Sequence, residues 1–174
     1  VATGIADFEG HLITILDFEK IVSEISPELG IQYDDLKKLG PRGRSEKPLL
    51  LVEDSMLLSK MIVESLKRAG YENLTKTDNG QEAWDFLTEA KSSGDPITEH
   101  VCCVVTDIEM PQMDGHHLTK LIKEDPVLRQ LPVILFSSLI NEEMKRKGEM
   151  VGADAQISKP EIANLVTLID RLVK

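Results

Sequence analysis

The sequence has few aromatic residues and no long apolar run. Aromatic residues make up 4% of its 174 residues, whereas hydrophobic residues of all kinds make up 41%. A core must therefore be built mainly from aliphatic side chains. No run approaches the roughly 20 apolar residues needed to cross a bilayer, and no signal peptide is recognisable. We expect a cytoplasmic protein without direct membrane insertion.

Basic residues and cysteines are also few. Twenty Lys and Arg stand against thirty Asp and Glu, which gives a formal net charge of −10. A nucleic-acid partner is not expected, because binding to a phosphate backbone needs a basic patch. The two cysteines, Cys102 and Cys103, are adjacent, and neighbouring residues of a strand point to opposite faces. We expect no disulfide between them and interpret both as small buried side chains in a reducing compartment.

The stretch 101–115, VCCVVTDIEMPQMDG, is the most informative part of the chain. Its first five residues form an unbroken apolar run of the kind found in strands that are buried on both faces. The run ends on Asp107, and Pro111 and Gly115 predict a loop before a helical pattern begins. We therefore expect Asp107 at the carboxyl end of a central strand, where open α/β sheets bind ligands.

Strands and helices alternate from Pro48 onward. This alternation predicts a doubly wound α/β fold, with five parallel strands, helices on both faces and right-handed crossovers. The expected strands are 49–52, 74–77, 101–105, 132–137 and 155–158, and the expected helices are 55–69, 79–90, 116–123, 141–151 and 161–173, with a polar loop at 91–99.

Polar residues stand at the carboxyl ends of these strands. Glu53 and Asp54 follow the first strand, Asp107 follows the third, Ser137 ends the fourth and Lys159 follows the fifth. Clustered carboxylates repel one another unless a cation neutralises them, and hard oxygen ligands select Mg²⁺. The pattern predicts a Mg²⁺ site at which Asp107 acts as a nucleophile toward phosphorus, while Ser137 and Lys159 bind phosphoryl oxygens.

Four motifs carry a resemblance to a known family. LLVEDSMLLSKMI, VVTDIEMPQMDG, VILFSS and ISKP resemble, in order, the signatures of bacterial response-regulator receiver domains, over about residues 48–174. The resemblance implies a flavodoxin-like sheet of order 2-1-3-4-5. It also implies that a histidine kinase donates a phosphoryl group, whose loss the receiver itself catalyses without being an enzyme for other substrates. The implied roles are phosphoacceptor for Asp107, Mg²⁺ ligands for Glu53 and Asp54, a metal-binding backbone carbonyl for Glu109, switch hydroxyl for Ser137 and phosphate-binding ammonium for Lys159.

Two positions depart from the family pattern. Gln156 stands where receivers often carry an aromatic switch residue, so an inward aromatic swing is not available and the readout of phosphorylation must differ or be weaker. Glu109 stands where Asn or a small residue is commoner. We expect its negative charge to change the lifetime of the phosphoryl group or the metal preference.

The first 33 residues have a different pattern. They predict a strand, a turn near Glu9 and Gly10, a second strand at 11–16 and a helix from Asp17, followed by a Pro- and Gly-containing linker at 34–47. GIADFEGHLITILDFEKIVSEI resembles the last hairpin and helix of CheW-like coupling domains. A CheW-like domain before a receiver is the layout of CheV-type chemotaxis coupling proteins. We expect the tail of a larger domain; the alternative is an N-terminal extension packed on the receiver. The layout implies a chemoreceptor and kinase assembly as partner, and the open hairpin edge could pair with a second copy.

Other interpretations of the same residues are open. Asp54 or Ser55 could serve only as a helix cap, Lys159 could be a solvated charge, and His116 and His117 are interpreted as solvent-facing. The alternative function is a Mg²⁺-dependent aspartyl phosphotransferase or phosphatase for small molecules, although such families usually carry a second Asp at the position of Glu109. A structural pseudo-receiver fits less well because the acidic pair, acceptor and lysine are all present, and a DNA-binding regulator fits less well because the chain is acidic.

Overall fold

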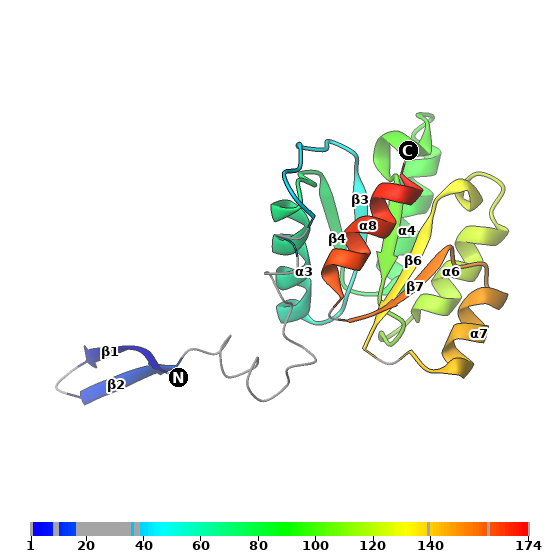
Figure 1. Ribbon diagram of the computed structural model, residues 1–174. Coiled ribbons are helices and arrows are strands. Elements are labelled where there is room, and N and C mark those ends of the chain that lie inside the picture. Colours follow the sequence, from blue (N-terminus) through cyan, green and yellow to red (C-terminus); the bar gives the residue numbers. More distant parts are fainter. Residues whose placement is uncertain are drawn as a thin grey trace.

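A computed structural model describes residues 2–8, 11–16, 36, 39–138, 140–159 and 161–173. Its main part is a five-stranded, all-parallel sheet of order β4-β3-β5-β6-β7 (Figure 1). The strands are β3 (Leu49–Val52), β4 (Leu74–Thr77), β5 (Cys103–Thr106), β6 (Val133–Ser137) and β7 (Ala155–Ser158). The predicted flavodoxin-like order 2-1-3-4-5 is confirmed.

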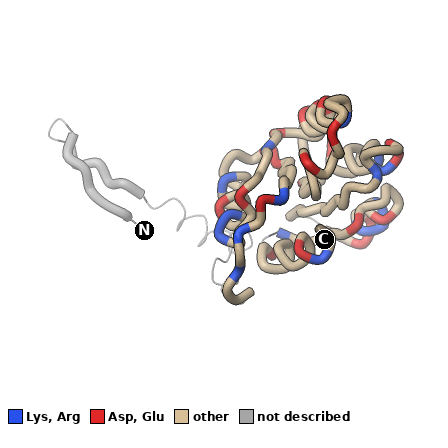
Figure 2. Tube along the Cα trace, turned by 90° about the horizontal axis from the view of Figure 1, so that it is seen from above, with Lys and Arg blue, Asp and Glu red and all other residues tan. Residues whose placement is uncertain are grey.

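Helices cover both faces of the sheet. They are α3 (Met56–Arg68), α4 (Gly80–Ser92), α5 (Ile97–His100), α6 (Gly115–Glu124), α7 (Glu142–Met150) and α8 (Ile162–Leu172), with a 3₁₀ turn at Leu128–Gln130. Residues of α3 and α8 pack in one buried cluster, and residues of α4 and α6 pack in a second. In Figure 2, acidic and basic positions are interspersed along the helices, as expected for amphipathic helices with one face in the core.

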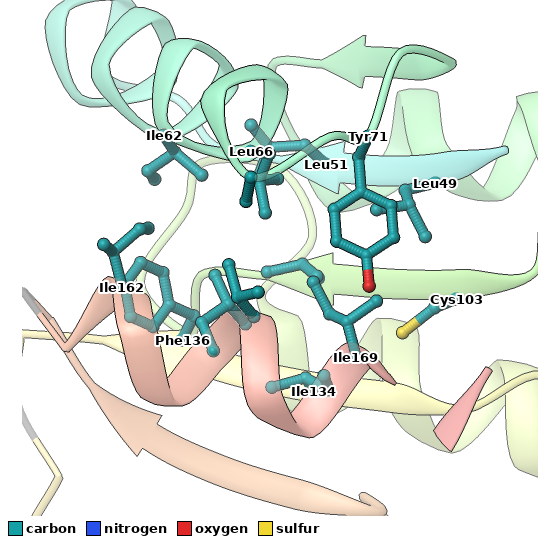
Figure 3. Close-up of a cluster of buried hydrophobic side chains, with 14 of the residues drawn as sticks. Leu49, Leu51, Ile62, Leu66, Tyr71, Cys103, Ile134, Phe136, Ile162 and Ile169 are labelled. Carbon is teal, nitrogen blue, oxygen red and sulfur yellow. The ribbon is translucent and has the colours of Figure 1, made fainter. Parts of the chain in front are cut away.

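Alternation along β3 explains why this strand is apolar at every position. Leu49 and Leu51 belong to the cluster with α3 and α8, whereas Leu50 and Val52 belong to the cluster with α4 and α6. All four are at most 2% exposed. Figure 3 shows the first cluster, in which β3, β6 and α8 contribute mostly aliphatic side chains. A strand with both faces buried favours an apolar residue at nearly every position.

Side-chain caps fix where four of the helices begin. Ser55, Asn79, Asp114 and Asn141 each accept a hydrogen bond from the backbone amide three residues later. Ser55 is therefore the cap of α3, and the carboxylate of Asp54 stays with the acidic residues of the strand ends. That choice between Asp54 and Ser55 was open in the sequence.

The segment before β5 differs from expectation. The predicted polar loop at 91–99 is wrong in part, because α4 extends to Ser92 and α5 forms at Ile97–His100. The strand accordingly begins at Cys103 rather than at residue 101. The physical reason is Ile97, which is 3% exposed and packs with the second cluster, so the chain gains buried area by making one helical turn there.

The two thiols lie in different environments. Both are free, as predicted, but only Cys103 is buried; Cys102 is half-buried and its thiol lies within hydrogen-bonding distance of the Thr98 carbonyl. Burial raises the pKa of the Cys103 thiol to about 12, and burial also raises the pKa of the Cys102 thiol. The prediction that both are buried is thus wrong for Cys102.

This difference predicts selective alkylation. Since the thiolate is the reactive form and access is required, N-ethylmaleimide should modify the folded chain at Cys102, whereas Cys103 should react only after unfolding in denaturant. Mass spectrometry of peptides from folded and denatured samples checks this result. Equal labelling of both cysteines in the folded protein would contradict it.

The N-terminal residues form the expected hairpin. β1 (Ala2–Phe8) pairs antiparallel with β2 (His11–Leu16). The predicted helix from Asp17 and residues 34, 35, 37 and 38 of the predicted linker lie outside the described residues. Within the described residues, no helix is long and apolar enough to cross a membrane.

Candidate functional site

Three carboxylates meet at the carboxyl edge of the sheet. Glu53 and Asp54 follow β3, and Asp107 follows β5, which is the neighbouring strand with Val52 opposite Thr106. A backbone hydrogen bond from Asp107 N to Val52 O, 2.9 Å long, continues this pairing to the strand ends. One oxygen of each carboxylate lies within 4.8 Å of the others, so the three could hold one cation together.

Lys159 enters this cluster from β7, two strands away from β5. Its Nζ donates to Glu53 Oε2 at 2.6 Å and to Asp107 Oδ2 at 2.8 Å. Its side chain is 4% exposed. Its backbone amide donates to Ser137 O at 3.0 Å, which holds the β7–α8 connection against the end of β6. A buried ammonium between two carboxylates lowers the repulsion between them.

Glu53 is the most buried acid of the cluster, with 1% of its surface exposed. Burial raises its pKa; Lys159 opposes this shift, and the negative charge of Asp107 adds to it. Its Oε1 accepts from the Ser55 amide at 3.3 Å. Glu53 is therefore held in one orientation between the lysine and the first residues of α3.

Asp107 is fixed but reachable. Its Oδ1 accepts from the Ile108 amide at 2.6 Å, while Oδ2 contacts Lys159. Its side chain is 11% exposed. An acid so restrained loses little further freedom when one oxygen forms a bond to an incoming atom.

A pocket opens beside the acidic cluster. It has a volume of about 440 Å³. Its walls come from the ends of β3 and β5, the start of α6 and one face of α7; they include Asp54, Glu109, Met110, His116, Met144 and Lys147. A ligand could therefore approach the carboxylates from the side of the pocket that α7 lines.

The structure brings together four of the six site residues named from the sequence, namely Glu53, Asp54, Asp107 and Lys159. Ser137 is buried at the end of β6 on the same edge, and the exposed side chain of Glu109 lines the pocket.

A fourth strand-end acid does not join the cluster. Asp78 follows β4 but is exposed and pairs with Lys76 at 2.5 Å.

Sequence reasoning missed the contributions of His116 and α7. His117 is exposed as expected, but His116 is half-buried, and its Nε2 has no hydrogen-bond partner among the described residues. His116 stands three positions before the buried Thr119, a spacing that points to the inner face of α6. Met144 and Lys147 carried no comparable signal, since nothing in the sequence places α7 beside the β5–α6 loop.

Gln156 is held by α7. Its Nε2 donates to the Lys145 carbonyl at 2.8 Å, and the side chain lies against Gly148. A Cβ at Gly148 would approach the amide group to under 3.0 Å. The amide thus occupies the position at which many receivers carry an aromatic ring, and it ties β7 to the middle of α7.

Comparison with known proteins agrees with this geometry. A family model described as "Response regulator receiver domain" matches residues 49–170. The chain belongs to this family. The receiver has the acidic cluster and the lysine at the sheet edge where its motifs placed them.

Among curated relatives, the receiver is similar to chemotaxis protein CheV2 of Helicobacter pylori. The two are 28% identical over 163 residues, which cover 94% of this chain and 50% of CheV2. The chain thus spans about half the length of this relative. The alignment extends beyond the residues that the family model matches.

Solved structures share the fold. The signal receiver domain of a histidine kinase from Syntrophus aciditrophicus is 31% identical, with a TM-score of 0.62, and the match covers 73% of this chain and 89% of that chain. The receiver domain of a sensor histidine kinase from Pseudomonas aeruginosa, solved with a magnesium ion in its active-site cleft, is 22% identical. Its TM-score is 0.61, and the match covers 74% of this chain and 98% of that chain.

Proposed function

We propose that the receiver accepts a phosphoryl group on Asp107 from a phosphohistidine of a sensor histidine kinase. The observation that carries the proposal is the contact of the Asp107 carboxylate with the buried Lys159 inside a three-carboxylate cluster. A carboxylate oxygen would form the new bond to phosphorus as the bond from phosphorus to the imidazole nitrogen breaks. The electron pair of that bond stays with the imidazole, which takes up a proton.

The residues present fit a divalent cation. Glu53, Asp54 and Asp107 offer three oxygen ligands within 4.8 Å of one another, a donor set that suits Mg²⁺. The backbone carbonyl of Glu109 would add a fourth ligand. A bound Mg²⁺ would supply charge neutralisation for phosphoryl oxygens. Receiver domains bind Mg²⁺ at an acidic pocket, which supports this assignment.

Lys159 and Ser137 would bind the transferred group. The Lys159 ammonium already lies 2.8 Å from the acceptor carboxylate and would neutralise one phosphoryl oxygen. The Ser137 hydroxyl, at the end of the strand beside β5, would donate to a second one. Movement of Ser137 toward the phosphoryl group would shift the β6–α7 connection, and with it a surface that contacts partners.

The setting we propose is chemotaxis, with residues 48–174 as receiver, 34–47 as linker and 1–33 as the end of a CheW-like coupling domain. Similarity to CheV2 over 94% of the chain supports it. Phosphorylation would tune the coupling of chemoreceptors to their kinase, or the domain would act as a phosphate sink. This work would take place in the cytoplasm at receptor arrays, with the hairpin edge available to a second copy.

One assay separates this proposal from the alternative of a phosphatase or phosphotransferase for small molecules. The full chain is incubated with acetyl phosphate or phosphoramidate and Mg²⁺. An acid-stable, hydroxylamine-labile adduct on Asp107 is the expected result. Rapid turnover of many phosphate monoesters without a lasting adduct would favour the enzyme instead.

Glu109→Gln is expected to change the lifetime of the adduct or the affinity for Mg²⁺. Glu109 is exposed on the pocket wall and adds a negative charge close to the site where the phosphoryl group would sit. The measurements are the dephosphorylation rate and Mg²⁺ titration calorimetry. Glu99→Gln is the control, because Glu99 lies in α5 at the other end of β5. If Glu109→Gln leaves both quantities unchanged, the side chain of Glu109 has no such role.

A further inference from the structure

Residues 40–47, here called the strap, lie outside the sheet and are bound to the segment between α3 and β4. Ser45 forms a parallel bridge with Tyr71, in which Ser45 N donates to Gly70 O at 2.7 Å and Glu72 N donates to Ser45 O at 3.1 Å. The strap also lies directly on the turn after α3, because a Cβ at Gly70 would meet the Gly43 carbonyl oxygen at under 3.0 Å. Its backbone is therefore part of the folded unit.

Arg42 attaches the strap to the last turn of α8. Its guanidinium donates two parallel hydrogen bonds to the Asp170 carboxylate, at 2.7 and 2.6 Å, and its Nε donates to Ala69 O at 2.8 Å. The Tyr71 hydroxyl donates to the same carboxylate. Hydrogen bonds from Arg42 and Tyr71 hold the pKa of Asp170 below its usual range. Bidentate geometry with a third donor makes this pair stronger than an ordinary surface ion pair.

Lys47 makes a second attachment to α8. Its Nζ donates to the Val173 carbonyl at 3.0 Å, directly after the helix ends. Carbonyls at the end of a helix lack partners within the helix and favour cations nearby. Two cationic side chains of the strap therefore hold the carboxyl end of α8: Arg42 binds the side chain of Asp170, and Lys47 binds the backbone carbonyl of Val173.

The other end of α8 begins beside the candidate phosphorylation site. Ile162 starts the helix three residues after Lys159, which contacts Glu53 and Asp107. Between its ends, α8 buries Ile162, Leu165, Val166 and Ile169 in the first cluster (Figure 3). A helix packed along its whole length moves as one body, so a shift at one end reaches the other.

We propose that the strap is a coupling element that favours the unphosphorylated receiver and loosens when Asp107 carries a phosphoryl group. The coupling rests on the proposed function of Asp107. A phosphoryl group inserted between Asp107 and Lys159 would change the 2.8 Å contact between them. The start of α8 must then adjust. Contacts at the far end of α8 that fit the unphosphorylated receiver then fit the phosphorylated receiver less well. The strap thereby links the state of Asp107 to the chain that precedes the receiver.

Arg42→Gln tests the coupling in the full chain, with beryllofluoride and Mg²⁺ as a stable substitute for the phosphoryl group. We expect Arg42→Gln to bind beryllofluoride about five-fold more tightly than the unaltered chain, a factor within the usual range for coupled sites. Arg44→Gln is the matched control, since Arg44 carries the same charge two residues away but has a side chain that is 84% exposed and, among the described residues, pairs only with Glu72, at 3.6 Å. Its affinity should equal that of the unaltered chain.

Hydrogen exchange supplies the reciprocal measurement. Beryllofluoride should speed exchange of the Ser45 and Glu72 amides in the unaltered chain, and Asp170→Asn should tighten binding as much as Arg42→Gln does, with no further gain in the double variant. If Arg42→Gln binds no more tightly, or if strap exchange does not rise, the coupling is overturned while the proposed function stands. If the unaltered chain does not bind beryllofluoride at all, the proposed function fails and the coupling fails with it.

Discussion

Asp107→Asn is expected to abolish the phosphoryl adduct. An amide is not a nucleophile at neutral pH. Among the described residues, the other carboxylate that contacts Lys159 is that of Glu53, and Glu53 is only 1% exposed. The change removes a negative charge but keeps the shape of the side chain, so the fold should persist. Intact-protein mass spectrometry after treatment with acetyl phosphate and Mg²⁺ measures the result, and circular dichroism verifies folding.

Asp78→Asn is the matched control for this variant. Asp78 also follows a parallel strand directly, but it lies outside the cluster and pairs with Lys76. The Asp78→Asn variant should be phosphorylated at Asp107 to the same extent as the unaltered chain. A full yield of adduct in Asp107→Asn would show that another residue is the acceptor.

Gly115→Ala is expected to be the most destabilising of the variants considered. A Cβ at this position would approach the Asp107 carbonyl oxygen and carbon to under 3.0 Å, and both atoms belong to the backbone. The Gly115 amide also donates to Ile108 O at 3.0 Å, which closes the β5–α6 loop. Backbone cannot yield as a flexible side chain can, so we expect a loss of about 3 kcal/mol in the free energy of unfolding, at the upper end of overpacking costs.

Urea unfolding followed by circular dichroism measures this loss. Gly43→Ala is the control, because nothing lies within 4 Å of the Cβ it would add; its free energy of unfolding should stay within about 0.5 kcal/mol of the unaltered value. Since the clash displaces the backbone of Asp107, Mg²⁺ affinity should fall in Gly115→Ala as well. Equal stability of Gly115→Ala and Gly43→Ala would contradict the tight approach.

Local sequence patterns were enough to predict the sheet and the edge that carries the candidate site. The apolar runs at β3, β5 and β6 could be assigned because both faces of a central parallel strand are buried, which leaves no polar position in the run. The acidic and basic residues that follow these runs were predicted to share an edge, and the structure brings Glu53, Asp54, Asp107 and Lys159 together. Family motifs supplied the strand order.

Other features depend on contacts between distant parts of the chain. The turn of α5 forms because Ile97 finds a place in the second cluster, and four residues alone would not form a helix. Asp78 and Asp107 both follow strands, and only the position of each strand in the sheet and its surroundings leave one exposed and the other in the cluster. His116 is half-buried and lines the same pocket as Met144 and Lys147 of α7, which its helical position only partly indicates.

By itself, the sequence determined the alternation of strands and helices and the chemistry available at the strand ends, since both follow from periods of a few residues. Only the tertiary structure decided that Lys159 bridges Glu53 and Asp107, and that Arg42 holds Asp170 across 128 positions. The reason is physical: the strength of an ion pair depends on the distance between its two groups and on how far water is excluded from them, and neither quantity exists until the packed helices and sheet bring those groups together.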